Sequence, residues 1–201
     1  MTANALVWLR NDLRLADNPA LQAAVKLGGK ITALYVHETN PKLRTPGGAV
    51  LWWLAQSLCS LEKNLNLRNV ELLVAHGDAL EIIDKLIEEN GFDSIFWNRR
   101  YAPQERDIDA VVKSTLKDKG LNVVSFAGNL LAEPWEIKTG SGGSYQVFTP
   151  YAKTRRQQGV NRPLSSSNWI AEPPSLKYKP DWEHYIQPYR SKKMHGIWTS
   201  A

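Results

Sequence analysis

The alternation of two residue patterns over the first 130 residues restricts the fold more than any other feature. Five short runs are apolar and rich in β-branched or aromatic residues, as is typical of strands buried on both faces of a parallel sheet. Segments with helical spacing separate these runs, and this alternation predicts right-handed crossovers. The expected strands are residues 5–10, 31–37, 70–77, 94–98 and 122–128. We therefore predict an α/β fold with a doubly wound, five-stranded parallel sheet flanked by helices.

The helices carry recognisable start and stop signals. In the first, Asn18 suits the N-cap, Pro19 the first helical position, and Gly28 or Gly29 the end. The third opens on an Asp cap and closes on Gly91, and the fourth runs from about Pro103 to Gly120. In the second helix, one face is expected to contain Val50, Trp53, Leu54, Leu58, Leu61 and Leu65.

Charge and proline content divide the chain near residue 160. Residues 1–150 hold 16 Lys and Arg against 17 Asp and Glu, a net −1, whereas residues 151–201 hold 9 against 3, a net +6. Five of the 11 prolines also lie in 151–201, where apolar residues show no period. We predict one domain over 1–160 and a proline-rich, basic, largely irregular linker tail over 161–201. Such a tail could meet nucleic acid, but a solvated linker is the favoured interpretation.

Other features argue for a cytoplasmic protein. The single cysteine, Cys59, excludes an internal disulfide and any multi-cysteine metal site. No apolar run is long enough to cross a bilayer, and the N-terminus does not resemble a signal peptide. We therefore expect a reducing compartment and no membrane association.

The motif search excludes the common catalytic sets. The sequence has no G-x-G-x-x-G after the first strand, no P-loop and no G-x-S-x-G, and its four histidines lack metal-ligand spacing. In an open α/β sheet, ligands bind beyond the carboxyl ends of the strands. The stretch NRRYAPQE (98–105) belongs to that edge, which makes its side chains the first candidates for a binding site.

Four residues at this edge are candidate ligand contacts. Glu105 could accept two parallel hydrogen bonds from a ring edge such as that of a pterin, and Gln104 can donate and accept. The alternative, which spacing alone favours, is that Glu105 only stabilises a helix N-terminus. His37 ends a strand and could edge a pocket, although most histidines in such positions only form local hydrogen bonds. Arg10 belongs to a charge cluster with Asp12, Arg14 and Asp17 after the first strand. These charges either pair with each other at the surface, which is the favoured interpretation, or brace the loop over a ligand or against another domain.

Six segments, taken together, resemble DNA photolyases and cryptochromes. They occur in the family's order and place the resemblance over residues 5–155 or so, with the greatest similarity to bacterial class I cyclobutane pyrimidine dimer photolyases. The segments are LVWLRNDLRLADNPAL, RTPGGAVLWWLAQSLCSLEKNL, VAHGDALEII, WNRRYAPQERDID, NLLAEPWEI and YQVFTPYAKTRR.

The resemblance implies a Rossmann-like antenna domain. The family's N-terminal domain holds a light-harvesting chromophore, usually methenyltetrahydrofolate or a deazaflavin, which passes excitation to FAD for electron transfer to the DNA lesion. In folate-binding members an Asn-Glu pair holds the pterin, and Gln104 and Glu105 occupy those positions here. Close relatives usually have a Ser-Arg pair where this chain has Val50 and Leu51.

The resemblance also leads us to expect a chain truncated before the family's helical FAD-binding domain, which carries the lesion pocket and the DNA-binding groove. By itself the chain is then expected not to repair DNA, and a separate chain is a candidate source of that domain. Two alternatives remain: a free Rossmann-like module that binds a nucleotide or folate, and a nucleic-acid binder acting through the basic tail.

Overall fold

The computed structural model describes residues 2–159, 162–164 and 168–180. Its centre is a five-stranded, all-parallel sheet in the order β3-β2-β1-β4-β5. The predicted α/β, doubly wound fold is confirmed. The strands are β1 (Asn4–Leu9), β2 (Lys30–Glu38), β3 (Glu71–Gly77), β4 (Ser94–Asn98) and β5 (Asn122–Phe126).

Four helices cover the two faces of the sheet. Buried residues of α1 and α2 form one apolar cluster with Ala5, Val7 and Leu9 of β1, whereas those of α3 and α4 form another with Leu6 and Trp8. Because side chains alternate along a strand, β1 contributes to both clusters. The helices are α1 (Pro19–Leu27), α2 (Gly48–Asn66), α3 (Ala79–Asn90) and α4 (Pro103–Asp118).

The predicted helix signals are confirmed at α1 and α3. The Asn18 side chain accepts a hydrogen bond from the Leu21 N–H at 3.2 Å, and α1 ends at Gly28. Asp78 caps α3, and Gly91 ends that helix in the left-handed conformation at φ 65°. Such signals can be recognised in the sequence because a capping residue forms its hydrogen bonds with residues within one turn of the helix.

Only the C-terminal part of the predicted apolar face of α2 is buried. Leu58, Leu61 and Leu65 are buried, but Val50 and Trp53 are 59% and 69% exposed. Helical spacing places all of these residues on one side, but only the later turns of α2 pack on the sheet. Among the described residues, no helix is long and apolar enough to cross a membrane.

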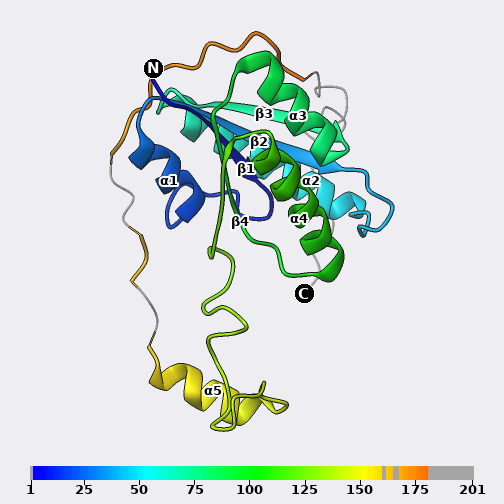
Figure 1. Cartoon of the computed structure of the whole chain (residues 1–201), viewed down its shortest axis with the longest axis vertical. Coiled ribbons are helices and arrows are strands. Elements are labelled where there is room, and N and C mark those ends of the chain that lie inside the picture. Colours follow the sequence, from blue (N-terminus) through cyan, green and yellow to red (C-terminus); the bar gives the residue numbers. More distant parts are fainter. Residues whose placement is uncertain (1, 160–161, 165–167, 181–201) are drawn as a thin grey trace, which may run out of the picture.

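Beyond β5 the chain leaves the sheet for a helix that the sequence patterns do not assign. This helix, α5 (Phe148–Gln157), lies apart from the sheet and has no buried residue (Figure 1). It is held to the preceding loop, since Tyr145 and Thr154 share a hydrogen bond at 2.8 Å and Arg155 donates to the Leu131 carbonyl at 2.6 Å.

Residues 168–180 return to the body and cross the amino-terminal edge of the sheet. Glu172 pairs with Lys30 at the start of β2, and its N–H donates to the Gly29 carbonyl at 3.0 Å. Asn90 accepts from the N–H groups of Lys177 and Tyr178 at 2.7 and 3.0 Å. This part of the predicted tail has irregular backbone but fixed contacts, whereas residues 160–161, 165–167 and 181–201 lie outside the described residues.

Candidate functional site

The order of the strands creates a crevice at the carboxyl edge of the sheet. β1 is followed by a crossover to β2 on one side, and its other neighbour, β4, is followed by a crossover to β5 on the opposite side. Loops therefore diverge between β1 and β4, which is where open α/β sheets bind ligands. A cavity of about 520 Å³ lies at this edge; its lining includes Arg10, Asn11, Tyr35, His37, Glu38, Lys42, Arg44, Arg100, Gln104 and Glu105.

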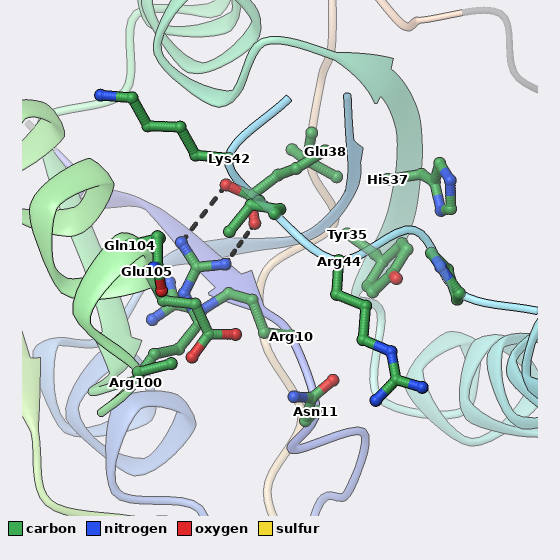
Figure 2. A pocket seen from close by; sticks show the side chains of 14 residues that line it. Arg10, Asn11, Tyr35, His37, Glu38, Lys42, Arg44, Arg100, Gln104 and Glu105 are labelled. Carbon is green, nitrogen blue, oxygen red and sulfur yellow. Dashed lines mark hydrogen bonds and ion pairs between the residues drawn. The ribbon is translucent and has the colours of Figure 1, made fainter. Parts of the chain in front are cut away.

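Two buried arginines and two carboxylates form a network at the base of this cavity. Asp109 accepts from Arg10 at 3.0 Å and from the Nε and Nη2 of Arg100 at 3.1 and 2.6 Å. Arg100 also pairs with Glu38, as the dashed lines in Figure 2 show. Because each charge has an opposite partner, the network can stay ionised away from water, and it ties α4 to β2 across the end of β1.

Aromatic rings lie beneath the arginines. The guanidinium carbon of Arg10 is 4.2 Å from the centre of the Trp8 ring, and Trp8 meets Trp97 edge-on at 5.6 Å. Burial lowers the pKa of Arg10 to about 10, with Arg100 adding to the decrease and Asp109 opposing it. The ring stack and the ion pair together hold Arg10 in place as a rigid wall.

A second polar cluster shapes the loop after β1. The Asn98 amide donates to Asp12 at 2.5 Å and to Asn18 at 2.9 Å, while its oxygen accepts from the Ala20 N–H at 3.2 Å. A Cβ on Gly128 would lie only 2.6 Å from the Asn98 side chain. Close packing therefore requires glycine there, and β4 fixes the loop that borders the cavity.

All four predicted site residues line this cavity. Gln104 and Glu105, in the first turn of α4, lie on one side, and His37 lies on the other, together with Arg44 (Figure 2). Arg10 lines the cavity too, but its charge faces Asp109. The favoured surface pairing of the Arg10 cluster is wrong: Arg10 and Asp12 are both buried, because their partners come from β4 and α4.

Two side chains of β2 have shifted proton affinities. His37 stacks on His76 with ring centres 5.4 Å apart and planes 9° from parallel, and burial and the second imidazole lower the pKa of His37. Burial, and then the charge of Glu38, raise the pKa of Tyr35 to about 12. Both side chains therefore face the cavity without charge near neutral pH. The neutral ring of His37 can stack on a ligand or accept a proton.

Sequence reasoning missed the partners that complete the site. It gave no role to Glu38, Tyr35 or Arg44, and it did not connect Arg100 with Asp109. The available signal was the position of Glu38 directly after the predicted strand 31–37, because residues at the carboxyl ends of neighbouring parallel strands lie close together. Within the described residues, no group of three or more His, Cys, Asp or Glu could hold a metal ion.

The fold and the crevice define a class: a doubly wound α/β domain with a polar cavity at its switch point. Comparison with known proteins gives the family. The DNA photolyase family model matches residues 5–168, and the chain belongs to that family.

The chain corresponds to the N-terminal domain of these proteins. It is 39% identical to the deoxyribodipyrimidine photo-lyase of Agrobacterium fabrum over 98% of this chain and 42% of the relative. It is 30% identical to cryptochrome-2 of Arabidopsis thaliana over 93% of this chain and 31% of the relative. The chain thus spans about two fifths or less of the length of these relatives.

Solved structures agree. The crystal structure of a bacterial class III photolyase from Agrobacterium tumefaciens superposes with a TM-score of 0.82 at 38% identity, covering 94% of this chain and 38% of that one. An archaeal photolyase from Sulfolobus tokodaii, solved with two FAD molecules, superposes at 0.77 with 17% identity over 94% of this chain and 42% of that one. This second likeness concerns the fold alone.

Proposed function

We propose that this chain is the antenna domain of a cytoplasmic deoxyribodipyrimidine photolyase and holds its light-harvesting chromophore in the cavity between β1, β2 and α4. The observation that carries the proposal is the position of Glu105. Its side chain, in the first turn of α4, lines a preformed cavity beside Gln104 and opposite His37 and Arg44. A carboxylate there can accept two parallel hydrogen bonds from a pterin edge.

The cavity suits a flat, polar pigment. Its volume of about 520 Å³ falls within the usual range for small-molecule sites. The ion pairs of Arg10 and Arg100 keep its base rigid, so a bound ring loses little energy to reorganisation. Methenyltetrahydrofolate is the favoured pigment because Glu105 matches its hydrogen-bonding edge, and a deazaflavin is the alternative.

Repair itself requires a second cofactor and a lesion site. We propose that a helical FAD-binding domain, on the same polypeptide or on a separate chain, receives the excitation and contacts the DNA. The class I placement expected from the sequence is not supported by the relatives. We propose class III instead, and the 38% identity to a bacterial class III photolyase supports this proposal.

An absorption spectrum tests pigment binding directly. The purified chain is mixed with methenyltetrahydrofolate and desalted, and retention of a near-ultraviolet band is expected. Glu105→Ala should abolish the band. The matched control is Glu81→Ala, which removes an acid from the first turn of α3, away from the cavity, and should retain it. Equal retention by both variants would refute the role of Glu105.

A further inference from the structure

A second cavity, of about 450 Å³, lies between α4, the end of β5 and the segment around Trp135. Arg100 lines this cavity as well as the first one, and it pairs with Glu38 on one side and Asp109 on the other. The buried arginine therefore separates the two cavities. Pigment binding as proposed above uses none of Arg106, Lys113 and Trp135, which line the second cavity.

The second cavity contains a partly buried cation without a counter-charge. The Lys113 ammonium donates to the Ser125 hydroxyl at 2.9 Å, and within the described ranges neither Lys113 nor Arg106 forms an ion pair. Burial, followed by the charges of Lys117 and Arg99, lowers the pKa of Lys113. Taking a charge from water is costly unless it is paired, so this ammonium favours an anion beside it.

The other charged residues that line the cavity do not neutralise Lys113. Arg99 is neutralised by Glu133 at 2.8 Å, and Arg100 by Asp109 at 2.6 Å. Two carboxylates, Asp107 and Asp109, line the cavity. Within the described part of the chain, Asp109 is paired and Asp107 forms no ion pair. Arg106 and Lys113 outweigh it, which leaves the cavity with a net positive charge.

An exposed indole ring forms another wall. Trp135 is 56% exposed, and the guanidinium carbon of Arg99 lies 5.7 Å from its ring centre. The segment that carries Trp135 is anchored, because Glu133 accepts from Arg99 at 2.8 Å and from the Tyr101 hydroxyl at 2.8 Å. The ring is therefore presented to the cavity in a fixed position, which lowers the entropic cost of stacking a planar ligand on it.

We propose that this second cavity binds a nucleoside monophosphate. Lys113 and Arg106 contact its phosphate, and Trp135 stacks on its base. Ammonium and guanidinium groups are the usual partners of phosphate, and an indole face accepts any base because each base has a π-face. The volume is sufficient for a ligand of this size.

Isothermal titration calorimetry with three probes tests the proposal: adenosine 5′-monophosphate, inorganic phosphate and adenosine. The monophosphate is expected to bind with a Kd of about 1 mM or lower, and more tightly than either part alone. Equal affinity for phosphate and the monophosphate would refute the contribution of Trp135. Absence of monophosphate binding at millimolar concentrations would refute the site.

Single substitutions locate the binding. Lys113→Gln and Trp135→Ala should each weaken monophosphate affinity about tenfold, as expected for loss of a charge contact or one stacked base. The matched control is Lys117→Gln, one turn further along α4 and outside the cavity lining, which should change affinity less than about twofold because an exposed charge is screened. Arg106→Gln, at an exposed position, gives a further variant if Lys113→Gln does not fold. Equal weakening by Lys117→Gln would reduce the binding to general charge attraction and overturn the site.

Discussion

Removal of the Asp109 carboxylate should destabilise the domain more than removal of any surface carboxylate. Asp109 accepts three hydrogen bonds from two buried guanidinium groups, and Arg10 has no other carboxylate within ion-pair distance in the described residues. Loss of one partner from a buried pair costs about 3–5 kcal/mol. Because Arg100 keeps its pair with Glu38, we expect the lower value for Asp109→Ala, about 3 kcal/mol.

Urea denaturation followed by circular dichroism measures this loss. With a slope of about 2 kcal/mol per molar urea, the midpoint should fall by about 1.5 M. Asp84→Ala is the matched control, since Asp84 also lies within a helix and pairs with Lys119 at the surface. It should cost less than about 1 kcal/mol. Equal midpoints for the two variants would refute the argument that the buried network holds α4 to β1 and β2.

Three further predictions concern packing and protonation. Gly128→Ala should lower the urea midpoint by the equivalent of about 1–3 kcal/mol, because its Cβ would overlap Asn98; an unchanged midpoint would mean that the loop yields. Since the pKa of His37 is lowered, the fold resists its protonation, and acidification below about pH 6.5 should favour unfolding. His76→Ala should raise that pKa in an NMR titration, and no change would exclude His76 as a cause. Burial and Glu133 raise the pKa of Tyr101 to about 12. The stability that this tyrosine contributes is present below about pH 10 and is lost as the pH rises toward 12. Tyr101→Phe should therefore flatten the decline in melting temperature at alkaline pH. An unaltered decline would contradict this prediction.

The fold was predictable because its signals are local or periodic. Strands covered on both faces need apolar residues at almost every position, and the runs around Val7, Leu34 and Val74 show this pattern. Asn18 and Gly28 mark the ends of α1 through contacts within a single turn. Such features depend little on the rest of the chain.

The exposed face of α2 and the helix α5 were not predictable in this way. Spacing places Val50 and Trp53 in line with buried leucines, but it does not reveal how much of a helix the sheet covers. α5 buries no residue, so no apolar stripe marks it. Thr154 and Arg155 of this helix form hydrogen bonds with the preceding loop, and only the tertiary structure reveals these contacts.

The sequence by itself determined the α/β class, and it predicted the carboxyl edge as the location of the candidate site, with Glu105 and His37 among its residues. Tertiary structure alone decided which charges are neutralised. Arg10 lies 99 positions from Asp109 in the chain, and Arg100 lies 62 positions from Glu38. In this fold the pairs form because the carboxyl ends of β1, β2 and β4 lie side by side, next to the first turns of α4. The same residue types can therefore form a solvated surface cluster or the buried wall of a pocket, and packing determines which of the two they become.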